Sequence, residues 1–300
     1  MRALFLSLLL AALAGNAFAE MKPFELNMDR VEIDAKKPLG FSETYFIPSA
    51  NLLITASGDV WAQSKAGGSN AQAHGKYFVK GLDRVFVQDL ARKVQDDLVT
   101  KMRAAGYTVL TYEDLKGEAD VAGHSREKVD EKWGLPVRSQ NSFDFVFVTP
   151  TTEQAFEKPI TGPVFWLRDL AKAKNLTVIV PEMVFEVPIM YGQTSSGYKR
   201  DSAGIAVSPA MRLNGAAVWT IDGKNRAGNI LIQQHGVRLA AEVAGTPKLM
   251  SDDQTEFSRS WKRSSSDWVM ELDPVAFSDG ILRVGYAIND LIVKQAKKAH

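Results

Sequence analysis

One stretch decides the fold, residues 82–115, which read LDRVFVQDLARKVQDDLVTKMRAAGYTVLTYEDL. Its apolar residues fall at 82, 85, 86, 90, 94, 98 and 102, the spacing of a helix with one buried face. Gly106 follows at a position where a left-handed residue commonly ends a helix. Tyr107–Tyr112 then has the composition of a strand, and Glu113–Leu115 opens a short helical turn. The stretch therefore predicts a long amphipathic helix followed by a strand.

The chain downstream of this stretch predicts a second helix between two strands. Phe143–Val148 is predicted to be a strand, and Leu176–Val180 is a nearly continuous apolar run, as buried strands tend to be. Between them, Pro163 suits the first turn of a helix that runs to Lys174. Strand, helix and strand at this spacing predict a βαβ unit, while the polar residues 116–142 predict a surface excursion.

A long helix is also predicted at the C-terminus. Asp273 is a good N-cap residue, and Pro274 suits the first helical position. One apolar stripe follows at helical spacing: Phe277, Ile281, Val284, Ile288, Leu291 and Gln295. The chain therefore closes with a helix that covers a core.

Alternating residues and turn signals predict hairpins. The expected pairs are 52–55 with 60–62 around Ser57–Gly58, 216–221 with 230–234 around 222–225, and 256–262 with 267–272 around 263–265. The expected division is a signal peptide (1–19), an N-terminal β segment (20–70) and an α/β domain with C-terminal hairpins and a closing helix (71–300). The fold class is α+β or α/β, a mixed sheet with long amphipathic helices packed on it.

The first residues have the pattern of an export signal. Arg2 is followed by the apolar run Ala3–Leu13, and Ala17-Phe18-Ala19 is a small-x-small cleavage site. The run is too short for a membrane anchor, which needs about 20 apolar residues. We expect cleavage after Ala19 and a periplasmic protein with no transmembrane segment in the mature chain.

The net charge and the lack of cysteine limit which partners and covalent attachments the protein can have. The net charge of +1 falls to zero once Arg2 is removed, which argues against nucleic acid, because nucleic-acid binding needs an excess of cations. The sequence has no cysteine, so neither a disulfide nor a lipid-bearing cysteine is possible. We expect an envelope protein as the partner, and the oligomeric state is open.

Catalytic and cofactor signatures are missing from the sequence. The four histidines stand at no metal-ligand spacing, and no glycine-rich phosphate loop follows a strand, so no metal and no cofactor is expected. Glu182 and Glu186 alternate with Val184 along a predicted strand. We interpret that alternation as a solvated strand face rather than as a pair of catalytic carboxylates.

Two segments remain as candidate ligand- or partner-binding sites. Thr151 and Thr152 follow the strand 143–148, and ligands of open α/β sheets bind beyond strand ends. The alternative is ordinary helix capping by threonine. The second segment, residues 191–200, carries Tyr191, Tyr198, Lys199 and Arg200, residue types favoured in recognition surfaces. Its alternative is a solvated connecting loop.

The layout resembles a known family. The long helix, Gly106 and the strand with its acidic turn through Leu115 are similar to the helix–strand–turn of the curli secretion-channel family and its periplasmic relatives. Val218–Lys224 through Ile230 is similar to the later hairpin of that family, and related helix–strand units occur in the N-terminal domain of TolB-like proteins. The resemblance implies an accessory, binding or scaffold role in the envelope. The chain lacks the family's lipid-bearing cysteine, and its sequence predicts no long amphipathic hairpins, so neither channel function nor any site residue is carried over.

Two functions from different classes follow. The first is an exported binding or envelope-assembly protein without catalytic activity. The alternative is an exported hydrolase whose site is assembled from distant residues, which a single sequence cannot reveal.

Overall fold

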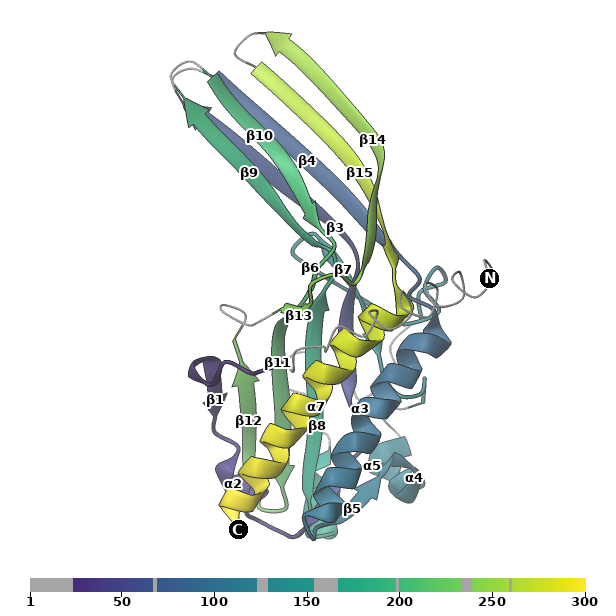
Figure 1. The fold of residues 1–300 in the computed structure, drawn as a ribbon. Coiled ribbons are helices and arrows are strands. Elements are labelled where there is room, and N and C mark those ends of the chain that lie inside the picture. Colours follow the sequence, from purple (N-terminus) through teal and green to yellow (C-terminus); the bar gives the residue numbers. More distant parts are fainter. Residues whose placement is uncertain are drawn as a thin grey trace, which may run out of the picture.

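The computed structural model describes residues 24–66, 69–122, 129–153, 167–197, 200–233, 239–258 and 261–300 (Figure 1). The expected signal peptide, Tyr198 and Lys199 lie outside these residues. The helices are η1 (Met28–Arg30), α2 (Lys36–Leu39), α3 (Arg84–Ala104), α4 (Tyr112–Leu115), α5 (Ala119–Ala122), α6 (Arg168–Ala173) and α7 (Pro274–Ala299). The chain has the mixed α/β class expected from the sequence.

Most strands belong to one large mixed sheet. The strands are β1 (Val31–Ile33), β2 (Thr44–Ile47), β3 (Asn51–Ala66), β4 (Ser69–Lys80), β5 (Thr108–Thr111), β6 (Val137–Gln140), β7 (Phe143–Val148), β8 (Thr177–Glu186), β9 (Ile189–Gly197), β10 (Arg200–Ser208), β11 (Met211–Asp222), β12 (Ala227–Ile232), β13 (Leu239–Ala241), β14 (Gly245–Ser258) and β15 (Trp261–Leu272). The main order is β1-β12-β11-β8-β3-β4-β15-β14. Strands β2, β5, β6, β7 and β13 attach beside this path, and the described residues of β9 and β10 form a separate two-stranded sheet.

Helices α3 and α7 lie side by side on one face of the lower half of the sheet (Figure 1). We call this half of the sheet, together with the helices that cover it, the body. Asp83 caps α3 by accepting from the Phe86 amide, and Asp273 caps α7 by accepting from the amides of Val275 and Ala276. All six residues of the predicted C-terminal stripe are buried. The two helices are also joined by a polar contact, because Asn289 Nδ2 donates to the Val94 carbonyl at 2.8 Å and to Asp97 Oδ2 at 2.9 Å.

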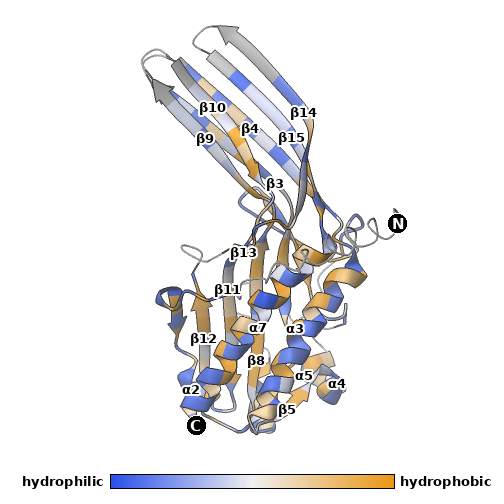
Figure 2. Cartoon of the chain, viewed as in Figure 1, coloured by the Kyte–Doolittle hydropathy of each residue, from blue (hydrophilic) through white to orange (hydrophobic). Residues whose placement is uncertain are grey.

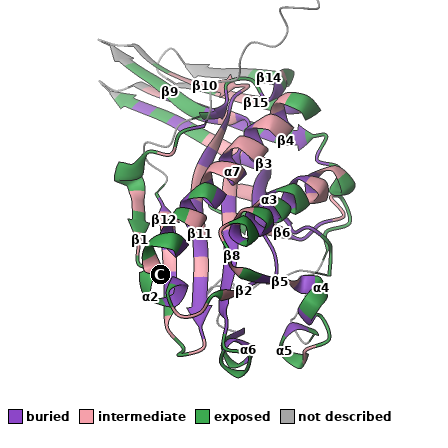
Figure 3. Ribbon diagram, turned by 60° about the horizontal axis from the view of Figure 1, so that its bottom comes forward, coloured by how far each residue is buried: buried purple, intermediate pink, exposed green. Residues whose placement is uncertain are grey.

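The opposite face of the body is covered by the short helices α4, α5 and α6. Their apolar side chains form a second cluster with the sheet: Phe46, Tyr112, Leu115, Val121, Leu170, Val178, Val180 and Ile221. Figure 3 shows the buried residues concentrated in β8 and β11, between the two sets of helices. The body therefore has the apolar interior that gives a domain its stability.

Three strand pairs continue beyond the body and form what we call the hairpin layer (Figure 1). Its described residues are 59–66 with 69–76, 189–197 with 200–208, and 248–258 with 261–268. Strands β3, β4, β15 and β14 continue the large sheet, with β15 parallel to β4. The hairpin β9–β10 packs on one face of β3 and β4. A Cβ atom on Gly192 of β9 would lie 2.7 Å from Ala62 Cβ, and one on Gly75 would lie 2.5 Å from Met190 Cε. The two sheets approach closely because these glycines have no side chain.

The structure corrects several sequence predictions on strand pairing. No turn forms at Ser57–Gly58, since β3 continues through these residues with a bulge between Thr55 and Ser57. The turn predicted at 263–265 is also wrong, because β15 runs without interruption from Trp261 to Leu272. The turn at 222–225 is confirmed, and the Asp222 side chain fixes it by accepting from the amides of Lys224 and Arg226.

Two further expectations are wrong. Strands β7 and β8 do not form a parallel βαβ unit, because β3 lies between them, antiparallel to β7 and parallel to β8. The region 191–200 is not a connecting loop, since its described residues belong to the strands of the hairpin β9–β10. Long hairpins are therefore present although the sequence predicted none. Strand β4 crosses residue 70, so β3 and β4 share one sheet across the expected boundary.

In the part of the chain that the structure describes, none of the helices combines the length and the apolar character needed to cross a membrane.

Candidate functional site

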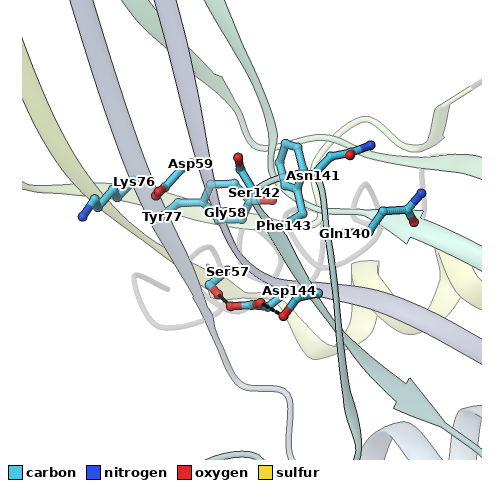
Figure 4. A pocket seen from close by; sticks show the side chains of 11 residues that line it. Ser57, Gly58, Asp59, Lys76, Tyr77, Gln140, Asn141, Ser142, Phe143 and Asp144 are labelled. Carbon is cyan, nitrogen blue, oxygen red and sulfur yellow. Dashed lines mark hydrogen bonds between the residues drawn. The ribbon is translucent and has the colours of Figure 1, made fainter.

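A cavity of about 440 Å³ opens where β3 and β4 leave the body and meet the turn between β6 and β7 (Figure 4). We call it the junction pocket. Its lining consists of Ser57, Gly58, Asp59, Lys76, Tyr77, Ser139, Gln140, Asn141, Ser142, Phe143 and Asp144. Most of the lining residues carry a hydroxyl, amide or carboxyl group, and the aromatic rings of Tyr77 and Phe143 add apolar surface, so the cavity suits a ligand with both polar and apolar faces.

The β6–β7 turn that forms one wall is held in place by its backbone. Asn141 and Ser142 both have positive φ, 49° and 70°, as the two central residues of a type I′ hairpin turn require. The Ser142 carbonyl accepts from the Asp59 amide at 2.9 Å, which ties the turn to β3. A Cβ atom on Gly58 would lie 2.5 Å from the Phe143 ring, so only glycine lets that ring lie against β3.

Asp144 is the most firmly held polar side chain of the pocket. Its Oδ2 atom accepts from the Ser57 hydroxyl at 2.7 Å (Figure 4), and its Oδ1 atom accepts from the Ser139 hydroxyl at 2.6 Å. These bonds fix the carboxylate between two strands and leave each oxygen a further lone pair for a ligand. The described lining includes no histidine, so neither serine has the imidazole base of a serine nucleophile here.

An aromatic pair stands on the sheet face next to the pocket. Trp61 of β3 and His74 of β4 are opposite each other in the register and stack with ring centroids 3.8 Å apart and an angle of 11° between the rings. His74 Nε2 also lies 3.8 Å from Asp59 Oδ2. Trp61 nevertheless remains 56% exposed. Since His74 covers one face of the indole, the exposed area lies on its other face and its edges.

The sequence-predicted site residues are not brought together. Tyr191 lies on β9 with 48% of its surface exposed, and Arg200 begins β10. Thr151 and Thr152 are exposed, and they follow the last residue of β7, which pairs with Leu52. The Thr151 carbonyl accepts a hydrogen bond from the Thr149 hydroxyl at 2.6 Å.

The two candidate segments lie far apart along β3. Thr151 and Thr152 follow the residue that pairs with Leu52, whereas Gly192, next to Tyr191, packs against Ala62. These two positions are about 30 Å apart at roughly 3.3 Å per residue of strand. Tyr191 also faces away from β3, because the neighbouring Gly192 faces β3 and side chains alternate along a strand. The two segments therefore belong to different surfaces.

Glu182 and Glu186 do not form a solvated strand face, which corrects the sequence interpretation. Their side chains are only 20% and 8% exposed, and each has an arginine partner. Arg138 lies 3.6 Å from Glu182, and Arg212 Nη2 lies 2.6 Å from Glu186. Burial raises the pKa of both carboxyls above the usual value, and the arginines offset only part of that rise. These groups are buried ion pairs within the sheet.

The junction pocket is a site that sequence reasoning missed. Its walls come from residues 57–59, 76–77 and 139–144, which are distant in sequence. The only local signal was Asn141-Ser142 between two alternating segments, a weak hairpin turn signal within the charged region 116–142. The described residues also contain no group of three or more potential metal ligands.

No family model, no curated protein and no solved structure matches this chain. The chemistry of the junction pocket therefore rests on its own residues.

Proposed function

We propose that this protein is an exported binding or assembly protein of the cell envelope, that it acts without catalysis, and that the hairpin layer binds its partner. The observation that carries the proposal is the contrast between the body and the layer. Figure 2 shows β8 of the body as mostly hydrophobic, whereas β9 and β15 of the layer are mostly pale or hydrophilic.

Energetics support a binding role for the layer. Its buried side chains on β3 and β4 are small ones: Ala62, Ser64, Ala71 and Ala73, together with Gly75. Burying one methyl group contributes about 0.8 kcal/mol, whereas ordering one residue costs about 1–2 kcal/mol in backbone entropy. Side-chain burial alone therefore does not offset the ordering of these strands. Met190, Ile205 and Val207 of β9 and β10 do contact the main core, but most of the length of β3 and β4 in the layer adds little to it. That part of the layer is better explained by what its surface contacts.

The surface of the layer offers isolated apolar anchors among polar groups. Trp61 on β3, Tyr191 on β9, and Leu249 and Met250 on β14 are all exposed. Exposed aromatic and large apolar side chains on a polar background are typical of recognition surfaces. Among the described strands, β14 has β15 as its one partner and stands at the edge of the sheet, so its other edge offers backbone groups to a partner strand.

The experiment is site-specific photo-crosslinking in intact cells, with p-benzoylphenylalanine at Tyr191, at Leu249 and, as the matched control, at Val275. Val275 is 72% exposed but lies in the first turn of α7 on the body. We expect the same discrete adduct from both layer positions and none from Val275. Adducts from Val275 alone, or from no position, would contradict the proposal. Mass spectrometry of the same material should show Glu20 as the first residue, and an intact Met1 would refute export.

A further inference from the structure

We propose that the junction pocket and the exposed face of Trp61 form one binding site for a neutral oligosaccharide. This inference rests on the proposed function and names the class of ligand that the protein would bind. One sugar ring would stack on the indole, and the adjoining part of the chain would place its hydroxyls in the pocket.

The Trp61 indole supplies the stacking platform. His74 stacks on one face of the indole with the ring centroids 3.8 Å apart, and Trp61 remains 56% exposed, so the other indole face is available to a ligand. That face is turned away from β4, on the side where β7 pairs with β3 only as far as Gly58. The flat C–H face of a pyranose ring makes dispersion contacts with such a surface. A partly exposed, immobilised indole loses little conformational entropy when a ligand stacks on it.

The polar groups of the pocket lie next to this platform. Asp59 is two residues before Trp61 on the same face of β3, so the two side chains are about 7 Å apart along the strand. The Asp59 side chain is 41% exposed, and its backbone is fixed by the bond to Ser142. A sugar ring is itself several ångströms across, so a disaccharide or longer chain can contact both Trp61 and the pocket.

The chemistry of the lining favours hydroxyls over ionic groups. The side-chain amides of Gln140 and Asn141 can both donate to and accept from vicinal sugar hydroxyls, and the Asp144 carboxylate can accept from them. The lining carries two carboxylates, Asp59 and Asp144, against the single ammonium of Lys76. This excess of negative charge disfavours phosphorylated, sulfated or uronic acid ligands. The volume of about 440 Å³ is in the range of small-ligand sites, about 300–1,000 Å³.

Preorganisation supports a ligand site rather than an accidental hollow. Hydrogen bonds from two hydroxyl groups hold the Asp144 carboxylate in place. Asn141 and Ser142 adopt the left-handed backbone conformation of a tight turn, and the hydrogen bond from the Asp59 amide holds that turn against β3. Polar groups held in place before binding lose less entropy on binding than mobile ones do.

The test uses the purified mature protein and three neutral probes: maltotetraose, cellotetraose and chitotetraose. Binding is followed by tryptophan fluorescence and by calorimetry. We expect saturable binding of at least one probe, a loss of affinity of at least about tenfold in Trp61→Ala, and largely retained affinity in Trp61→Phe, which keeps an aromatic face. Asp144→Asn should weaken binding as well. Val275→Ala, at an exposed position in the first turn of α7 on the body, is the control and should bind like the parent.

Three results would overturn the inference: no saturable binding of any neutral probe, equal binding by Trp61→Ala, or tighter binding of a heparin-derived tetrasaccharide. Thermal unfolding of each variant shows whether it is folded. The crosslinks from Tyr191 and Leu249 separate this inference from the proposed function. If they form while every oligosaccharide fails, the protein is a binding protein with a different ligand. If both fail, the proposed function falls as well.

Discussion

Gly192→Ala is the substitution that most sharply tests how the two sheets of the hairpin layer pack. The new methyl group would lie 2.7 Å from Ala62 Cβ, 3.0 Å from the Trp61 carbonyl oxygen and 3.2 Å from Ala62 Cα. Two of these three atoms are backbone, so rotation of a side chain cannot relieve the contact. Hairpin β9–β10 must move away from β3. Overpacking of this kind typically costs about 1–3 kcal/mol.

The matched control is Gly204→Ala on the paired strand β10. A Cβ atom there would have no neighbour within 4 Å, and its φ is not in the left-handed region. We expect its free energy of unfolding to stay within about 0.5 kcal/mol of the parent, as for most surface substitutions. Urea unfolding gives the global free energy, and amide hydrogen exchange of β9 and β10 reports on the layer itself.

A second variant tests the mechanism of the effect. Ala62→Gly removes the atom nearest to the new methyl group, so the double variant Gly192→Ala/Ala62→Gly should be more stable than the sum of the single effects by about 0.5–1.5 kcal/mol. Additive effects, or a Gly192→Ala protein with unchanged exchange in β9 and β10, would refute the packing described for the layer.

Two further predictions concern the body. The pKa values of Glu182 and Glu186 are raised, so their favourable contribution to stability is complete below the unfolded-state pKa of about 4.5 and is lost as the pH rises through the folded-state values. Arg212→Gln should therefore destabilise the protein more at pH 7 than at pH 5 in urea titrations, and an equal loss at both pH values would count against a buried Glu186 carboxylate. Asp273→Ala removes the acceptor for two amides of α7 and should cost about 1 kcal/mol, measured by the same titrations, whereas Asp273→Asn should keep most of the cap. An Asp273→Ala protein as stable as the parent would argue against that cap.

Elements with strong local signals were predictable from the sequence. The apolar spacing from Leu82 to Met102 and the Asp273-Pro274 start of α7 each depend on neighbouring residues only. The start of the buried stripe of α3 differs from the prediction. The apolar spacing places Val85 in the stripe, but α3 buries Val87 and leaves Val85 66% exposed. The turn at 222–225 was found because a single aspartate makes its bonds locally.

The hairpin layer escaped prediction because its buried positions carry small residues. Along β4 the inward residues include Ala71, Ala73 and Gly75, none of which is a β-branched or aromatic residue of the kind that indicates a strand. A pattern method that looks for alternating large apolar residues therefore finds no strand. At Ser57-Gly58 the tertiary contacts of the bulge, above all the bond from Ser57 to Asp144, outweigh a local turn signal.

The junction pocket and the buried ion pairs depend on contacts between distant segments. Arg138 of β6 reaches Glu182 of β8 only because β7 and β3 place those strands on one sheet. Residues 116–142 are predicted from the sequence to be a surface excursion. That prediction indicates neither the role of this arginine nor the turn that forms the pocket wall. Sites of this kind become visible only once the strand order is known.

The central claim is that the body provides the stability of the fold, which leaves the hairpin layer free for binding. Native-state hydrogen exchange of the purified mature protein tests it directly. We predict that amides of β9 and β10 exchange through openings at least about 2 kcal/mol lower in free energy than those of α3 and α7, because local openings range from near zero up to the global free energy. Equal opening free energies in the layer and in the body would contradict the account.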